Sequence, residues 1–151
     1  MQIEGFSLIE MLAVMFIIAL AGAAAIPLAG NFVERGTPKV VLQKVQSLTL
    51  ETRSTAISTG RPQSIAINVP GRAISDIDRR QEIELPEAFR IHLTVGIEEV
   101  REDGSALVWF YPDGGTTGAT LILDDEGGNA ARLSISWLNG GATLSQLDDL
   151  R

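Results

Sequence analysis

The sequence has no cysteine and a single histidine, His92. Without cysteine the chain forms no disulfide, thiolate zinc site or iron–sulfur cluster, and it offers no thiol nucleophile. One histidine excludes metal sites built from several imidazoles. Basic residues are also scarce: 12 Lys and Arg stand against 19 Asp and Glu, for a net charge of −7. Nucleic-acid binding needs clustered cations. We therefore predict no enzyme, no metal, no cofactor and no nucleic-acid partner.

Charged residues are absent from the 23 residues between Met11 and Val33. At a rise of about 1.5 Å per residue, a helix of this length reaches roughly 34 Å, enough to cross a hydrocarbon core of about 30 Å. The run is longer than the apolar part of a secretory signal peptide. All twelve basic residues follow it. The pattern predicts an apolar stem followed by an acidic, water-soluble domain from residue 34 to 151.

Two features set the stem apart from a plain membrane anchor. The step from Gly5 to Phe6 changes a polar pentapeptide abruptly into an apolar stretch, and Glu10 places a carboxylate inside that stretch. An acidic side chain at the middle of a bilayer costs about 2.5–3.5 kcal/mol, and less near an edge. Glu10 therefore either lies near the membrane interface or pairs with a positive group.

Gly5, Phe6 and Glu10, followed by the apolar run, resemble the type IV prepilin signal. The resemblance implies cleavage between Gly5 and Phe6, N-methylation of Phe6, and a role for Glu10 in setting subunit register. It also implies that Pro27 is the helix-distorting proline common in pilins, since proline removes a backbone donor. The leader contains no Lys or Arg, so the positive-inside rule does not support its orientation, which rests on the resemblance.

The register role has a physical basis. The α-amino group of Phe6 in one subunit is a cation and Glu10 of a neighbour is an anion, both within a dry bundle of helices. A buried charge without its partner is expensive, so the pair resists axial slip even if its net stability is modest. The resemblance thus divides the chain into a leader (1–5), a transmembrane and assembly helix (6–33) and a periplasmic domain (34–151). The alternative is an ordinary, uncleaved anchor.

The start of the domain predicts an amphipathic helix over about residues 38–59. Thr37 is a candidate N-cap and Pro38 suits the first helical position, while Gly60 and Pro62 end the pattern. Apolar and small residues recur every three to four positions, which indicates a core stripe laid against a sheet. These residues are Val41, Val45, Leu48, Thr52 and Ala56.

The sequence predicts strands in the rest of the domain. Alternation or apolar runs between turn residues predict strands at 64–69, 90–95, 106–111, 118–123 and 131–138, with a return at 142–144 after Asn139-Gly140-Gly141. The alternation puts His92 on a polar, solvated face beside Arg90 and Thr94. We expect an α+β fold, which the prepilin resemblance makes pilin-like: a long N-terminal helix, transmembrane in its first half, packed on an antiparallel sheet.

The C-terminal part carries a second resemblance. The motif Phe110-x-Pro112-x-Gly114, the strand that follows and the final glycine turn are similar to the H-type minor pseudopilins of type II secretion. That family implies an inner-membrane protein that joins the tip region of the periplasmic pseudopilus and helps to export folded proteins. Its implied partners are the I-, J- and K-type minor pseudopilins, the major pseudopilin, the prepilin peptidase and the assembly platform.

Other interpretations stay open. The chain is alternatively a minor pilin that primes a type IV pilus, or a membrane-anchored periplasmic binding domain with no filament role. The loop from Asp124 to Asn129 is either a solvated turn, which we favour, or a calcium loop, although Gly128 stands where a third ligand belongs. A mixed-charge segment is predicted to be a loop that contacts another subunit. Its residues are Arg72, Asp76, Asp78, Arg79, Arg80, Glu82, Glu84 and Glu87.

Overall fold

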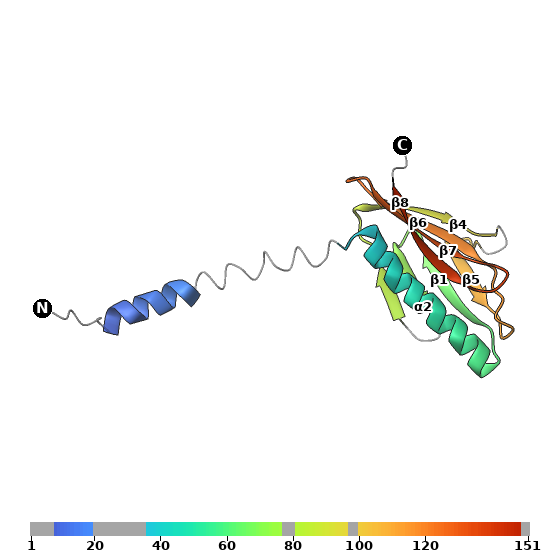
Figure 1. Cartoon of the computed structure of the whole chain (residues 1–151), viewed down its shortest axis with the longest axis horizontal. Coiled ribbons are helices and arrows are strands. Elements are labelled where there is room, and N and C mark those ends of the chain that lie inside the picture. Colours follow the sequence, from blue (N-terminus) through green and yellow to red (C-terminus); the bar gives the residue numbers. More distant parts are fainter. Residues whose placement is uncertain (1–7, 20–35, 77–80, 97–99, 149–151) are drawn as a thin grey trace, which may run out of the picture. The chain divides into compact units, whose positions relative to one another are not determined.

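The structure is a computed structural model that describes residues 8–19, 36–76, 81–96 and 100–148. The chain divides into two compact units, residues 1–35 and residues 36–151, which are described separately below. In the first unit, residues 8–19 form an α-helix, drawn in blue in Figure 1. Gly5, Phe6 and Pro27, to which the prepilin resemblance assigns roles, lie outside the described residues.

The second unit begins with helix α2, Pro38–Thr59. Thr37 occupies the N-cap position in an extended conformation, and its carbonyl accepts the N–H groups of Val40 and Val41 at 2.9 and 3.2 Å, but its side chain makes no capping hydrogen bond. Gly60 ends the helix with a φ of +65°, the left-handed conformation that favours glycine. The predicted bounds and core stripe are confirmed. The buried residues of α2 are Pro38, Val41, Leu42, Val45, Leu48, Thr49, Thr52 and Ala56.

Among the described residues of this unit, eight strands form two antiparallel sheets of four. The first sheet has the order β3-β2-β1-β5 and consists of β1 (Gln63–Asn68), β2 (Ala73–Asp76), β3 (Gln81–Glu84) and β5 (Ser105–Phe110). The second has the order β4-β6-β7-β8 and consists of β4 (Phe89–Thr94), β6 (Ala119–Asp125), β7 (Asn129–Ile135) and β8 (Ala142–Asp148).

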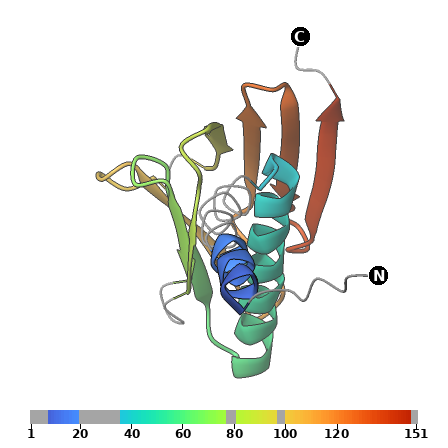
Figure 2. The same ribbon diagram turned by 90° about the vertical axis from the view of Figure 1, so that its left-hand side faces the viewer.

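Helix α2 packs against both sheets. It contacts β1, β2 and β5 of the first sheet and β6, β7 and β8 of the second. Figure 2 shows α2 with the first sheet on one side and the second sheet on the other. The core where they meet includes the fully buried Leu42, Ile74, Val108, Phe110 and Leu123. Burying side chains of this size stabilises the fold by about 1.5–3 kcal/mol each, so the helix holds the two sheets together through one shared core.

The α+β, pilin-like expectation is confirmed in class, but the sequence predicted one sheet where the structure has two. The prediction of a loop for the mixed-charge segment is also wrong, because this segment contains β2 and β3. Ile74 and Asp76 of β2 both point inward and are fully buried. Because a carboxylate occupies an inward position, the apolar alternation that marks a strand is broken there.

The strand predicted for residues 131–138 is too long at its end. Strand β7 stops at Ile135, and the chain turns at Ser136, whose N–H donates to the Gly141 carbonyl and whose own carbonyl accepts from Gly140 N–H, both at 2.9 Å. Trp137 and Leu138 therefore lie in the turn, each 71% exposed. Because both residues are apolar, the sequence pattern predicted that the strand continues through them. The strand ends earlier because the backbone of Ser136 forms its hydrogen bonds within the turn.

Candidate functional site

The helix of residues 8–19 carries Glu10, the one residue of the proposed assembly set that the structure describes. Glu10 is exposed, and it is the only charged residue in this helix. Large apolar side chains are exposed on all sides of the helix. They are Leu8, Ile9, Met11, Leu12, Val14, Met15, Phe16, Ile17 and Ile18. A helix that is apolar all round is suited to burial in a bundle or a membrane.

A helix with this composition gives Glu10 no positive neighbour. The residues one turn further on are Ala13 and Val14, and neither can neutralise a carboxylate. In an apolar environment the counter-ion of Glu10 has to come from outside this helix. Among the residues that the structure describes, no helix is long and apolar enough to cross a membrane. The predicted transmembrane and assembly helix of residues 6–33 lies largely outside them.

The motif from Phe110 to Gly114 connects the β5–β6 loop to helix α2. Phe110 is fully buried, and the chain turns after it, with Gly114 N–H donating to the Tyr111 carbonyl at 2.9 Å. The carbonyl of Gly114 then accepts a hydrogen bond from Arg53 Nε of α2 at 3.3 Å. The motif is thus a structural joint between α2 and the β5–β6 loop. No pattern in the sequence indicated this role of Arg53.

The turn between β7 and β8 packs against the same joint. Thr116 N–H donates to the Trp137 carbonyl at 3.4 Å. Gly140 has a φ of +63°, and a Cβ placed on it would lie 2.6 Å from both Arg53 Nε and the Gly114 carbonyl oxygen. Only glycine fits such a close backbone approach. The two glycine motifs that carry the pseudopilin resemblance therefore meet in space.

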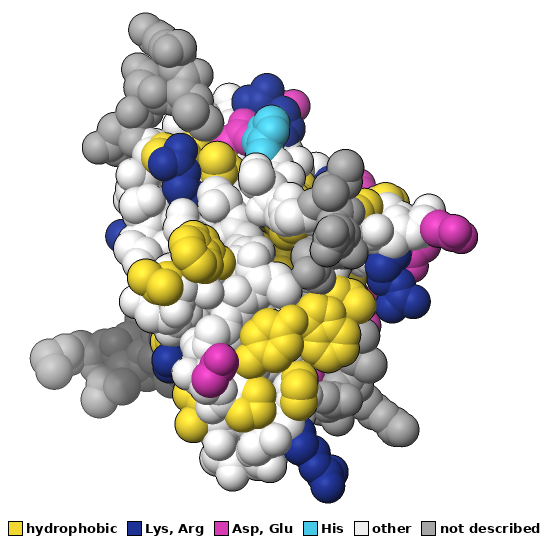
Figure 3. All heavy atoms as spheres, turned by 90° about the vertical axis from the view of Figure 1, so that its right-hand side faces the viewer, with side chains coloured by type: hydrophobic (Ala, Val, Ile, Leu, Met, Phe, Trp, Pro, Cys, Tyr) yellow, Lys and Arg dark blue, Asp and Glu magenta, His cyan; other side chains and the backbone are white. Residues whose placement is uncertain are grey.

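Apolar side chains reach the surface on the face shown in Figure 3, where hydrophobic groups gather in its lower half. Large exposed apolar residues in the two joined loops are Tyr111, 40% exposed, together with Trp137 and Leu138. Single exposed apolar residues are common, whereas groups of them often mark contact surfaces.

The single histidine lies on the solvent face of β4, as predicted, with its side chain 63% exposed. Its Nε2 lies 3.2 Å from Oδ1 of Asp124, and Arg90 contacts the other oxygen of the same carboxylate at 2.6 Å. The histidine, coloured cyan in Figure 3, stands beside acidic and basic side chains. Asp124 itself is only 9% exposed. Arg90 and Asp124 form an ion pair across β4 and β6, and His92 lies beside the same carboxylate.

In the loop from Asp124 to Asn129, Asp124 and Asp125 both have partners within the domain. Asp124 points toward Arg90, while Asp125 accepts two hydrogen bonds from Asn129, 2.9 Å from the backbone N–H and 2.8 Å from the side-chain amide. The bond from the Asn129 side chain is the main reason that the pKa of Asp125 lies below its usual value. Asp125 thereby closes the β6–β7 turn. No group of three or more potential ligands for a metal ion occurs among the described residues.

Within the mixed-charge segment, Asp76 is fully buried, and its Oδ2 accepts a hydrogen bond from the Thr52 hydroxyl at 3.2 Å. This contact fixes the end of β2 on α2. Asp78, Arg79 and Arg80 lie outside the described residues. Arg72 and Glu87 flank the strands, whereas Glu82 and Glu84 belong to β3.

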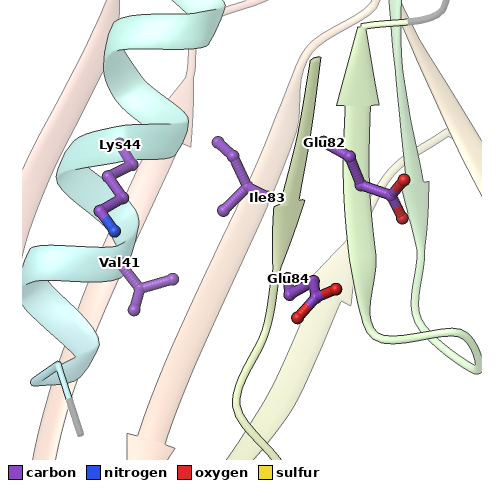
Figure 4. Close-up of a pocket in the computed structure, with 5 residues that line it drawn as sticks. All are labelled: Val41, Lys44, Glu82, Ile83 and Glu84. Atoms are coloured by element: carbon purple, nitrogen blue, oxygen red, sulfur yellow. The ribbon is translucent and has the colours of Figure 1, made fainter. Parts of the chain in front are cut away.

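A groove of about 400 Å³ separates the first half of α2 from β3, and we call it the α2–β3 groove. Val41 and Lys44 line it from α2, and Glu82, Ile83 and Glu84 line it from β3. Figure 4 shows Ile83 pointing toward α2 and both glutamates pointing to the opposite side of β3. The alternation Glu-Ile-Glu was the signal for a strand here, although it was too short to be recognised.

Comparisons with known proteins agree on the type of protein. The prokaryotic N-terminal methylation motif matches residues 1–26. A type II secretion system protein H from Xanthomonas campestris pv. campestris is 30% identical over 141 residues, which cover 92% of this chain and 81% of that protein.

Solved structures share the fold. The minor pseudopilin EpsH of the type 2 secretion system of Vibrio cholerae matches with a TM-score of 0.55 and 19% identity, covering 75% of this chain and 98% of that one. The type IV minor pilin FimU of Pseudomonas aeruginosa matches with a TM-score of 0.54 and 15% identity, covering 76% and 92%.

At these identities the two solved structures bear on the fold alone, which they show to be pilin-like. The relationship in sequence extends over nearly the whole chain. It joins the chain to structural components of a secretion machine rather than to enzymes. The chain belongs to the family of type II secretion system protein H, the H-type minor pseudopilins.

Proposed function

We propose that this chain assembles into the tip region of a periplasmic pseudopilus that helps to drive folded proteins across the outer membrane. The observation that carries the proposal is the coincidence, in one chain, of a methylation motif at residues 1–26 with whole-length similarity to a type II secretion system protein H. The domain supports the same role because its described residues bring acidic and basic groups together as ion pairs and turn contacts rather than as a catalytic site.

In this proposal residues 1–5 are a leader, residues 6–33 span the inner membrane and later form the assembly helix, and residues 34–151 form the periplasmic domain. The prepilin peptidase cuts between Gly5 and Phe6, and Phe6 becomes N-methylated. Pro27 loosens the helix because it lacks a backbone donor. The exposed apolar side chains of residues 8–19 support burial of this helix among others of its kind.

Glu10 sets the axial position of the subunit. Its own helix holds no cation within residues 8–19, so the amino group of a neighbour's Phe6 is the natural counter-ion. A shift by one residue along the axis separates the two charges by about 1.5 Å more and leaves each poorly compensated in an apolar bundle. The further partners are the I-, J- and K-type minor pseudopilins, the major pseudopilin and the inner-membrane assembly platform.

Substitution of Glu10 by valine tests the register role. The variant keeps the apolar surface and the periplasmic domain, and we expect normal folding with impaired incorporation into the pseudopilus. Glu4→Val is the matched control, because it removes the same group from the segment that is cut off. Normal incorporation of Glu10→Val would contradict the register role. Intact mass of the mature chain checks the processing: it should begin at a methylated Phe6.

A type IV minor pilin is the second candidate, and the likeness of the domain fold to FimU favours it. Deletion of the gene, assayed together for exoprotein release and surface pili, separates the two. Exoproteins trapped in the periplasm with normal pili support the pseudopilus. Lost pili with normal secretion support the pilus. If neither changes and Met1 is intact, the chain is a membrane-anchored binding domain.

A further inference from the structure

Strand β3 is the edge of the first sheet, and its free side borders the α2–β3 groove. Leu85 N–H donates to the Arg72 carbonyl at 2.8 Å just beyond the strand. Hydrogen-bonded and non-bonded pairs alternate along an antiparallel ladder, so the backbone of Ile83 bonds to β2. The N–H and C=O groups of Glu82 and Glu84 consequently face away from β2. In Figure 4, Ile83 points toward α2, so the helix covers this face of β3, and the open edge lies beside the groove between them.

An open edge is a template for another strand. Among the described residues, β3 pairs with β2 alone. Charged side chains on an edge discourage indiscriminate pairing, and they favour a strand of opposite charge. Two β3 edges brought together would oppose glutamate with glutamate, which is unfavourable in cross-strand pairs.

The side chains around this edge alternate in character. Ile83 points toward α2 and, together with Val41, gives the groove an apolar side. Glu82 and Glu84 are exposed on the opposite face of β3. Within the part of the chain that the structure describes, neither glutamate forms a salt bridge, and Lys44 on α2 forms none either. A strand added to β3 would place every second side chain beside the two glutamates and the others toward Val41.

We propose that the α2–β3 groove binds an extended segment of a neighbouring pseudopilin by strand addition to β3. The segment carries basic residues at alternate positions, opposite Glu82 and Glu84, with an apolar residue between them that packs toward Ile83 and Val41. The inference rests on the proposed function in one respect, the source of the segment. It adds to that function a specific surface and the sequence pattern of the partner that binds there.

A second copy of this chain is the competing occupant, because its edge strand β4 contains Arg90-Ile91-His92. The basic groups of that strand are already engaged, however. Arg90 lies 2.6 Å from Asp124, and His92 lies 3.2 Å from the same carboxylate. A segment whose basic side chains lack such a partner is attracted more strongly to Glu82 and Glu84.

Site-specific cross-linking of the full-length chain in its own host tests the proposal. The sequence has no cysteine, so Gln81→Cys gives one thiol at the edge of β3 for a maleimide–benzophenone reagent. Ser145→Cys is the matched control, since it is an exposed position on β8, the edge strand of the other sheet. We expect Gln81→Cys to yield an adduct with another pseudopilin, through a peptide with Lys or Arg at alternate positions, and Ser145→Cys to yield none.

Two further variants identify the contacts. Glu82→Lys with Glu84→Lys should lower the yield of the Gln81 adduct about tenfold, which corresponds to about 1.4 kcal/mol. Glu102→Lys with Glu126→Lys changes the net charge equally at exposed positions elsewhere and should leave the yield within about twofold. Glu82→Pro should also lower the yield, because it removes a backbone donor from the open edge while the bonds of Ile83 to β2 remain.

An adduct of two copies of this chain, the same adduct at Ser145, no adduct, or an equal loss in the control charge variant would each overturn the proposal. Gene deletion keeps the outcome separate from the proposed function. If deletion blocks secretion but the Gln81 adduct is absent, only the groove assignment fails. The opposite outcome is that secretion persists after deletion, while the adduct forms with the expected basic–apolar–basic peptide and its yield falls in the β3 variants. In that case the strand-addition site is supported and the export role is contradicted.

Discussion

Gly140 offers the sharpest test of how the domain is joined, because alanine at this position adds one methyl group and nothing else. The turn brings Gly140 against α2 and the β5–β6 loop. An added Cβ would lie 2.6 Å from the Gly114 carbonyl oxygen, and 2.6 and 2.8 Å from Nε and Cδ of Arg53. The arginine side chain can move, whereas the carbonyl belongs to the backbone of a tight turn. Relief therefore requires the hairpin to withdraw from the helix.

The cost has two parts. A φ of +63° costs an alanine about 1 kcal/mol relative to glycine. Overpacking against backbone adds about 1–3 kcal/mol, so Gly140→Ala should lower the free energy of unfolding by about 2–4 kcal/mol. Gly60→Ala is the matched control: its φ is +65° and no atom lies within 4 Å of the added Cβ. It should cost only the backbone part, about 1 kcal/mol.

Thermal unfolding of the purified full-length chain in detergent, followed by circular dichroism, compares the two variants. At about 4 °C per kcal/mol for a domain of this size, Gly140→Ala should unfold about 8 °C below Gly60→Ala. Adding Arg53→Ala to Gly140→Ala should recover part of the loss, because one of the two crowded groups is then gone. Equal midpoints for the two glycine variants would refute the claim that the loops and α2 touch at this point.

Three further predictions concern the domain. Thr52→Val keeps the volume but removes the hydroxyl that donates to the buried Asp76, and should lower the free energy of unfolding in a urea titration by about 1–3 kcal/mol. Asn129→Ala removes the main cause of the lowered pKa of Asp125, so this pKa should rise toward its usual value. In a carbon-13 NMR titration with acid, the Asp125 carboxylate should then become protonated at a higher pH than in the unsubstituted chain. Trp137→Ala should change the midpoint of thermal unfolding little, because the side chain is 71% exposed. The substitution also keeps the backbone carbonyl of residue 137, which accepts a hydrogen bond from Thr116 N–H.

The helix and most strands could be predicted because their signals are local. A proline at the first position, a glycine just past the end and a stripe of apolar residues fixed α2 to within its observed bounds. The strands after residue 100 also alternate or lie between glycine turns. Their start and end residues moved by only a few positions. Such patterns depend on backbone preferences and on one buried face, both of which are written along the chain.

The first sheet was partly missed because its evidence lies in tertiary contacts. Strands β2 and β3 have four residues each, which is too short for a period to be recognised. Asp76 looks like a solvent-exposed residue in the sequence, yet it is buried where the hydroxyl of Thr52 can reach it. That partner is 24 residues away in the chain, so no local pattern could have indicated it.

The candidate site also has parts that could be predicted from the sequence and parts that could not. Glu10 could be picked out from sequence because a carboxylate in an apolar run is conspicuous. The glycine motifs were recognised by their resemblance, but their physical role required the structure, since Arg53, Gly114 and Gly140 come from three separate elements. The acidic edge of β3 was predicted to be a loop, which is wrong, whereas its contact with another subunit stays a prediction.

The distribution of charge separates what holds the subunit together from what it offers to others. Asp76, Asp124 and Asp125 all have donors from the chain's own Thr52, Arg90 and Asn129, and each fixes a turn or a strand end. The charged groups of the apolar helix and of the groove differ, because within the described residues Glu10, Glu82 and Glu84 form no ion pair. A catalytic centre would bring such groups toward one another. Here they lie in two separate units of the chain, beside apolar surface in each. In the proposed function, their electrostatic partners are supplied when the subunit assembles.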